Sequence, residues 1–172
     1  MSESATPPLR VELLSDRHDR DGFTSGIEVL DRYLRQQAGQ DTRRRFASCF
    51  VLVAADDPAP IGYYTLAATG IALADLPEPL TKKLPRYPIV PATLMGRLAI
   101  DGRQQSKGYG ELLLFDAFSR TLRNEIASYA IVVDAKDENA AQFYRRYRFI
   151  PLVQGSRRLF LPVSEIAKIF AT

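Results

Sequence analysis

The strongest constraint on the fold is a polar loop that joins an apolar run to a helical stretch. Residues 93–100 have the length and composition of a buried strand, and residues 109–124 repeat apolar side chains at helical spacing. Between them, residues 105–110 (QSKGYG) place two glycines where the helix begins. Glycine lets the backbone approach a ligand closely, and a helix N-terminus offers unpaired N–H groups and a positive dipole end. The loop therefore predicts an anion cradle suited to a pyrophosphate.

Two other glycine motifs that bind phosphates do not fit this loop. The P-loop pattern needs a lysine after its last glycine, whereas Lys107 precedes Gly108. The dinucleotide-binding pattern Gly-x-Gly-x-x-Gly needs a third glycine where Leu113 stands. A tight strand-to-helix turn without a ligand remains the alternative for two glycines alone.

The order of the other segments predicts one α/β domain. An apolar strand at 46–55 is followed by a proline-containing turn and a strand at 61–67, which together indicate a hairpin. Strand and helix then alternate over residues 93–147, so we expect a sheet of mixed direction with helices on both faces. Residues 1–10 are expected to form a flexible arm, and residues 11–172 a single domain.

Local signals place the remaining elements. Ser25 is expected to cap a helix, with Glu28 as its capping-box partner, and this helix is expected to reach residues 43–45. Five prolines in residues 77–91 indicate an exposed connector with little regular structure. The other expected elements are an edge strand at 11–14, a strand at 128–135, a helix at 138–147, a closing hairpin of 149–153 and 157–161, and a terminal helix capped by Ser164.

Composition excludes several classes of protein. Cys49 is the only cysteine and His18 the only histidine, which excludes an intrachain disulfide framework and a Cys-rich zinc site. A Ser-His-Asp triad would have to use His18, and no Gly-x-Ser-x-Gly elbow accompanies it. No apolar stretch approaches the ~20 residues of a membrane helix, and the first eight residues lack the order of a signal peptide. We therefore expect a cytoplasmic protein without metal or membrane, with Cys49 in the core and His18 on the surface.

Positive charge gathers in two parts of the chain, although the net charge is only +3. Residues 82–110 hold six Lys or Arg against one acidic residue, and residues 136–158 hold six against two. Such local excess suits an anionic cofactor, a nucleic acid, or both. A solvated basic face is the alternative.

The loop and a second motif together resemble the GNAT (Gcn5-related N-acetyltransferase) family. That family has a strand followed by Gln/Arg-x-x-Gly-x-Gly/Ala and a helix, which residues 94–110 match. Its next motif is a strand and a short helix carrying an Asn and a Phe-Tyr pair, which residues 131–144 match in order and spacing. The resemblance implies the GNAT fold, an α/β fold with a mixed, mostly antiparallel sheet that is splayed at the acetyl-CoA site.

A narrower resemblance covers nearly the whole chain. Residues 30–45, 95–100, 134–137 and 159–162 are similar to acetyltransferase toxins of bacterial type II toxin–antitoxin modules. As this resemblance implies, such toxins transfer acetyl from acetyl-CoA to the α-amine of an aminoacyl-tRNA, which blocks translation. It also implies a ribbon-helix-helix antitoxin, repression of operator DNA by the pair, and a homodimer.

The resemblance assigns roles to individual residues. Tyr144 is the expected general acid, because a phenol with a reference pKa near 10 is protonated at neutral pH and can protonate the departing thiolate. An α-amine has a reference pKa of ~8, so no strong base is required. The residues expected to hold acetyl-CoA are Leu98, Ala99, Ile100, Arg103, Gln105, Ser106, Lys107, Gly108, Tyr109, Gly110, Asn139 and Phe143. Those expected to contact tRNA are Arg43, Arg44, Arg45, Lys82, Lys83 and Arg97.

One departure from the family and two other functions complete the expectations. Arg148 stands before Phe149 where the family has glycine, so the short helix must end differently or with strain. The acceptor could instead be a small-molecule amine or a protein N-terminus. A non-catalytic module of the same fold, which binds nucleic acid or a partner protein, is the third possibility.

Overall fold

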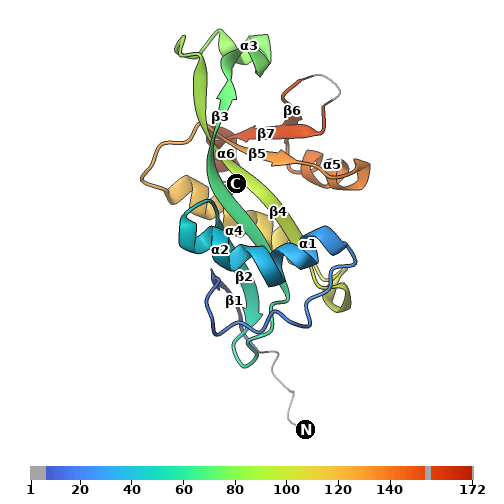
Figure 1. Ribbon diagram of the computed structural model, residues 1–172. Coiled ribbons are helices and arrows are strands. Elements are labelled where there is room, and N and C mark those ends of the chain that lie inside the picture. The colour runs from blue at the N-terminus through green and yellow to red at the C-terminus, as the bar shows by residue number, and fades with distance from the viewer. Residues whose placement is uncertain (1–6, 154–155, 172) are drawn as a thin grey trace. The chain divides into compact units, whose positions relative to one another are not determined.

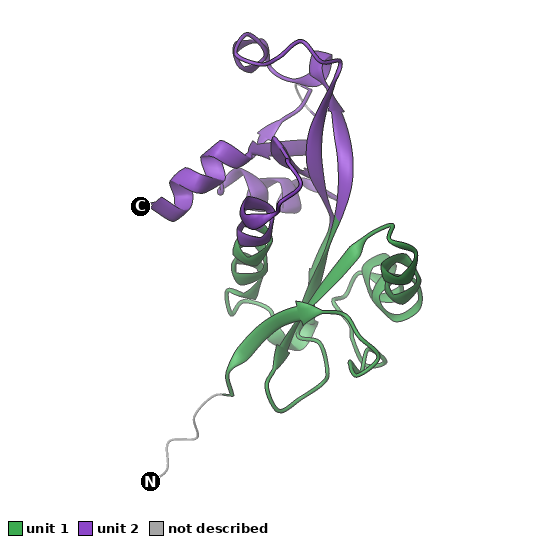
Figure 2. Ribbon diagram, turned by 90° about the vertical axis from the view of Figure 1, so that its left-hand side faces the viewer, with its two compact units in different colours: residues 1–66, 97–117 green, residues 67–96, 118–172 purple. Residues whose placement is uncertain are grey.

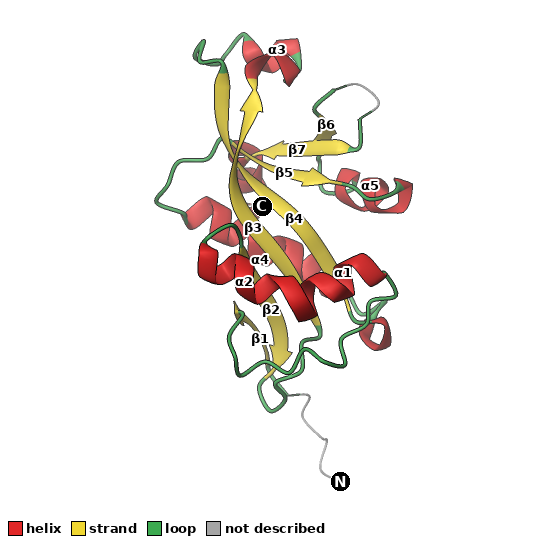
Figure 3. Ribbon diagram, in the orientation of Figure 1, coloured by secondary structure: helices red, strands yellow, loops and turns green. Residues whose placement is uncertain are grey.

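A computed structural model describes residues 7–153 and 156–171 of the chain, which form a seven-stranded sheet with helices (Figures 1 and 3). The strand order is β1-β2-β3-β4-β5-β7-β6. β4 pairs with β5 in parallel, while the β1–β2, β2–β3, β5–β7 and β6–β7 pairs are antiparallel. The expectation of a mixed, mostly antiparallel α/β sheet is confirmed.

The elements have the following bounds. The strands are β1 Leu9–Leu13, β2 Ser48–Ala54, β3 Gly62–Ala72, β4 Ile89–Ile100, β5 Ala130–Asp134, β6 Ile150–Pro151 and β7 Arg158–Pro162. The α-helices are α1 Glu28–Arg32, α2 Ala38–Arg44, α3 Glu78–Thr81, α4 Tyr109–Arg123, α5 Glu138–Arg145 and α6 Val163–Ala171. A π-helix, η1 Tyr33–Gln37, joins α1 to α2, and 3-10 helices lie at η2 Leu73–Asp75 and η3 Gly102–Gln104.

The chain forms two compact units (Figure 2). The first comprises Met1–Leu66 and Arg97–Ala117, and the second comprises Ala67–Gly96 and Phe118–Thr172. β3, β4 and α4 each contribute residues to both units.

In the first unit, helices cover both faces of the sheet. Alternate residues of β2 and β3, such as Val51 and Tyr63, pack with Leu34 and other side chains of the α1–η1–α2 segment in one buried cluster. Gly62, on the opposite face from Tyr63, approaches Leu113 of α4 so closely that a Cβ would lie 3.1 Å from its Cδ1.

In the second unit, β5 and β7 are buried on both faces. Val132 and Phe160 belong to a cluster with Ile71 and Leu152. Ile131, which points to the other face of β5, is fully buried too. This explains why residues 130–133 read as a continuous apolar run.

Two expected boundaries are wrong because nonlocal pairing orders the chain. β1 begins at Leu9, inside the expected arm, because it pairs with β2 through Leu9↔Ala54; residues 1–6 of that arm lie outside the described residues. The expected connector at 77–91 contains α3 and the start of β4. Leu80 and Leu84 pack there against a buried cluster that includes Leu76.

The expected capping box at Ser25 is also wrong. Its hydroxyl donates to the carboxylate of Asp31 at 2.6 Å, and its N–H donates to the same oxygen at 2.8 Å. The N-cap position is Ile27, whose side chain makes no capping bond, and Glu28 instead lies near Arg32. The buried Asp31 therefore replaces Glu28 as the partner of Ser25.

Candidate active site

The backbone of the loop before α4 has the conformation expected of an anion cradle. Ser106 and Gly108 have φ values of 65° and 81°, the left-handed region that favours glycine. A Cβ added to Gly108 would meet nothing within 4 Å, so the space above this backbone is open. α4 begins at Tyr109 and is 15 residues long, which gives its N-terminus a full helix dipole. These features fit the diphosphate of a coenzyme.

A buried carboxylate holds the start of this loop. Asp101 is 1% exposed and accepts the N–H groups of Thr24 and Arg103. The guanidinium of Arg103 donates to both carboxylate oxygens at 3.0 Å, and this pairing is the main cause that lowers the pKa of Asp101 to about 2. Arg103 was predicted to contact the cofactor; its side chain binds within the loop.

Two further side chains of the loop also bind within the protein. The amide nitrogen of Gln105 donates to the carbonyl oxygens of Ser25 at 3.2 Å and Ile100 at 3.4 Å. The ammonium of Lys107 donates to Oε1 of Gln104 at 2.9 Å. Gln105 thus ties the loop to the end of β4, while Lys107 remains exposed with its charge at the loop surface.

The end of β4 extends past its pairing with β5. The register runs from Ala92↔Ala130 to Met95↔Val133, and β4 continues to Ile100. Gly62 of β3 is essential to the packing there, because a Cβ would lie 2.8 Å from the carbonyl oxygen of Ala99. Leu98, Ala99 and Ile100, the predicted contacts of the acetyl group, lie in this segment.

Tyr144 lies in the second unit, on α5, which Asp137 caps by accepting the N–H of Ala140 at 2.8 Å. Its ring is 7% exposed and packs against Phe143 and Phe149, with centroids 5.2 and 5.3 Å away. Burial raises the pKa of the phenol above its usual value, so Tyr144 keeps its proton at neutral pH. Among the described residues, none forms a hydrogen bond with its hydroxyl.

The turn after α5 forms without the glycine that the family has at position 148. Arg148 takes the left-handed conformation itself, with a φ of 73°, and the N–H of Phe149 approaches the carbonyl oxygen of Tyr144 at 3.4 Å. The turn is therefore kept, with an arginine in a conformation that costs a side chain energy.

Of the other residues predicted to bind the cofactor, Asn139 is exposed in the first turn of α5 and Phe143 is half-buried. Arg146 lies over the ring of Phe143, at 5.6 Å from its centroid.

The basic residues predicted to bind tRNA fall in both units. Arg43, Arg44 and Arg45 are exposed at the end of α2, and Arg45 ends the helix with a φ of 61°. Lys82 and Lys83 are exposed after α3. Arg97 is half-buried, with its guanidinium carbon 3.6 Å from the ring centroid of Tyr33, a contact that no local pattern indicates.

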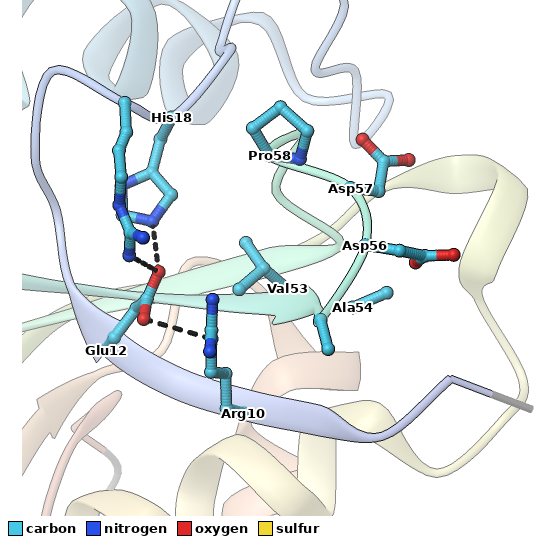
Figure 4. A pocket seen from close by; sticks show the side chains of 10 residues that line it. Arg10, Glu12, His18, Val53, Ala54, Asp56, Asp57 and Pro58 are labelled. Carbon is cyan, nitrogen blue, oxygen red and sulfur yellow. Dashed lines mark hydrogen bonds and ion pairs between the residues drawn. The ribbon is translucent and has the colours of Figure 1, made fainter.

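The expected surface position of His18 is wrong, whereas Cys49 lies in the core as expected. His18 is 6% exposed: Nδ1 accepts the N–H of Ser15 at 3.0 Å, and Nε2 lies 2.7 Å from a carboxylate oxygen of Glu12. Because Nδ1 accepts, Nε2 carries the proton and donates it to Glu12. His18, Glu12 and Arg10 are among the residues that line a pocket of about 220 Å³ (Figure 4).

The described residues contain no group of three or more His, Cys, Asp or Glu arranged to hold a metal. Nor is any described helix long and apolar enough to cross a membrane.

Comparisons with known proteins find curated relatives over most of the chain, although no family model matches it. A tRNA-acetylating toxin of Mycobacterium tuberculosis is 36% identical over 138 residues, which cover 79% of this chain and 81% of the toxin. A probable toxin TacT of Sinorhizobium fredii is 28% identical over 163 residues, 90% of each protein.

Solved structures of KacT and AtaT are also similar to almost the whole chain. A tyrosine-to-phenylalanine mutant of KacT has a TM-score of 0.88 at 31% identity, and covers 94% of this chain and 99% of its own. AtaT complexed with acetyl-methionyl-tRNAfMet has a TM-score of 0.85 at 31% identity, and the match covers 95% of this chain and 99% of AtaT. Related structures contain AtaTR bound with acetyl-CoA, an AtaT mutant toxin bound to the C-terminus of the antitoxin AtaR, and a KacTA–DNA complex.

The fold and site thus define a GNAT-fold N-acetyltransferase that uses acetyl-CoA as its acetyl donor. Within that class, the chain belongs to the family of tRNA-acetylating toxins.

Proposed function

We propose that this chain is the toxin of a type II toxin–antitoxin module, and that it transfers acetyl from acetyl-CoA to the α-amine of an aminoacyl-tRNA, which stops translation. The observation that carries the proposal is the open, left-handed backbone at Gly108 at the start of α4. The choice of acceptor is supported by the named activity of the M. tuberculosis relative and by the acetyl-methionyl-tRNA in the AtaT complex.

The donor is held mainly by backbone groups. The N–H groups of Ser106, Lys107, Gly108, Tyr109 and Gly110 bind the diphosphate, and Lys107 adds charge. The side chains of Arg103 and Gln105 fix the shape of the loop. Asn139 forms a hydrogen bond with the cofactor, and Phe143 lines the pantetheine arm.

The reaction forms a bond between the α-amine nitrogen and the acetyl carbon and breaks the bond from that carbon to sulfur. Backbone N–H groups of Leu98, Ala99 and Ile100 stabilise the developing oxyanion. The phenol of Tyr144 gives its proton to the departing thiolate, and the amine loses its own proton to solvent. Burial suits Tyr144 for this role because it keeps the phenol protonated.

The partners follow from the same family. A ribbon-helix-helix antitoxin neutralises the toxin in the cytoplasm, the pair represses its operator DNA, and the toxin is a homodimer. AtaT bound to AtaR and the KacTA–DNA complex support the antitoxin and the DNA.

The acceptor is tested by incubating the purified protein with radiolabelled acetyl-CoA and, separately, charged total tRNA, deacylated tRNA, polyamines and peptides with free N-termini. We expect label only in the charged tRNA, released as N-acetyl amino acid after mild alkaline hydrolysis. The Tyr144→Phe variant is the matched control, because it removes only the hydroxyl. Label on polyamine or peptide instead would identify a different acetyltransferase, and label on none of them would leave a binding module.

A further inference from the structure

Arg97 lies in the first unit and contacts the ring of Tyr33. Its guanidinium carbon lies over the Tyr33 ring, 3.6 Å from the ring centroid, which is a cation–π contact. Among the residues that the structure describes, none provides a hydrogen-bond or ion-pair acceptor to Arg97. A cation–π contact uses the charge of the guanidinium and leaves its N–H groups available to an anion.

The Tyr33 ring beneath it is fixed from two sides. Tyr33 is 6% exposed and stacks on Tyr63, with ring centroids 6.3 Å apart and planes at 17°. Its hydroxyl donates to one carboxylate oxygen of Asp41 at 2.8 Å, and the Gln37 amide donates to the other at 2.9 Å. Positions 33, 37 and 41 lie on one side of the η1–α2 segment, which supplies the polar support, while Tyr63 of β3 supplies the stacking.

The support is also electrostatic. The hydrogen bonds from Gln37 and Tyr33, and the charges of Arg97 and Arg44, lower the pKa of Asp41, which is therefore ionised at neutral pH. A phenol that donates to a carboxylate gains electron density on its ring, which strengthens attraction to a cation above it. Asp41 thus strengthens the contact between Arg97 and the Tyr33 ring, and it forms no hydrogen bond with the N–H groups of Arg97 among the described residues.

The position of Arg97 indicates what it binds. It directly precedes Leu98, in the strand segment to which we assign the acetyl carbonyl. Side chains alternate along a strand, so Arg97 shares a face with Ala99, which packs in the same cluster as Tyr33. The end of α2 carries Arg43, Arg44 and Arg45, a run of one sign that suits a polyanion, and the charge of Arg44 acts on Asp41 as that of Arg97 does.

We propose that Tyr33 and Asp41 are positioning residues that orient Arg97 toward a backbone phosphate at the acceptor end of the aminoacyl-tRNA. The inference rests on the proposed function and adds the residues that set its affinity for the nucleic acid.

The test compares KM for aminoacyl-tRNA with KM for acetyl-CoA in Tyr33→Leu, Tyr33→Phe, Asp41→Asn and Arg97→Ala. Tyr33→Leu removes the ring and is expected to raise KM for aminoacyl-tRNA about three- to tenfold, the worth of one cation–π contact. KM for acetyl-CoA and kcat stay within about twofold of wild type because the donor site is not touched. Tyr33→Phe and Asp41→Asn keep the ring and give smaller increases. Arg123→Ala, at the end of α4, is the control for loss of an arginine and leaves both KM values unchanged.

A double-mutant cycle separates positioning from a structural role. In an Arg97→Ala background, Tyr33→Leu should not raise KM for aminoacyl-tRNA further, whereas a structural defect would add to it. Arg97→Ala should also reduce the slope of log(kcat/KM) against log salt by about one. The inference is overturned if Tyr33→Leu leaves KM for aminoacyl-tRNA unchanged, raises both KM values alike, or acts additively with Arg97→Ala. Failure of the wild-type protein to acetylate any aminoacyl-tRNA would overturn the proposed function instead.

Discussion

Replacing Arg148 with glycine should stabilise the protein by relieving the left-handed turn that ends α5. The φ of Arg148 is 73°, a region that costs a side-chain-bearing residue about 1–2 kcal/mol. Glycine avoids that cost but loses about 0.5–1 kcal/mol more chain entropy on folding. The lost ion pair with Glu165 is 3.9 Å long and largely exposed, so its contribution is small. The net gain in the free energy of unfolding is about 0.5 kcal/mol.

Urea unfolding measures this gain, and Arg148→Ala is the matched control. Alanine removes the same ion pair but keeps the unfavourable φ, so the glycine variant should be more stable than the alanine variant by about 1 kcal/mol. Equal stability of the two variants would show that the turn is not strained. Acetyl transfer should be nearly unchanged in Arg148→Gly, because the turn next to Tyr144 keeps its shape.

Three other predictions concern the site. Gly62→Ala should lower the free energy of unfolding by about 1–3 kcal/mol in urea, because its Cβ would lie 2.8 Å from the Ala99 carbonyl oxygen; an unchanged midpoint would contradict this packing. Tyr144→Phe should lower single-turnover acetyl transfer at least about 100-fold with an unchanged melting temperature, and wild-type turnover would rule out its role as general acid. The pKa of Asp101 is lowered from 3.8 to about 2 in the folded protein. Its contribution to the free energy of unfolding is therefore fully present above pH ~4 and is lost as the pH falls toward 2. Urea midpoints between pH 2 and 5 should show that loss in wild type and less of it in Asp101→Asn.

The sequence predicts those parts of the fold that depend on local periodicity and on the two motifs. The strand, loop and helix around Gly108 and the helix that carries Tyr144 lie where their patterns place them, because backbone preferences there agree with the final packing. The prolines of residues 77–91 predict an irregular connector, whereas the structure places α3 and the start of β4 there. Leu76, Leu80 and Leu84 recur every four residues there, a spacing that indicates a helical turn despite the prolines.

Contacts between distant residues could not be predicted from local patterns. Tyr33 and Arg97 meet only because a helical segment packs on the strand face that carries Arg97, and nothing in either neighbourhood indicates the pair. His18 looks like a surface residue until Glu12 and the N–H of Ser15 provide partners for both ring nitrogens. Likewise, the sequence predicts that Arg103 contacts the cofactor, whereas the fold places the buried carboxylate of Asp101 against its guanidinium.

A crystal structure of the protein with acetyl-CoA tests the assigned donor site most directly. The account predicts the diphosphate within about 3 Å of the backbone nitrogens of residues 106–110, the acetyl carbonyl against residues 98–100, and the hydroxyl of Tyr144 beside the sulfur. Acetyl-CoA bound elsewhere, or a sulfur with no approach to Tyr144, would contradict it.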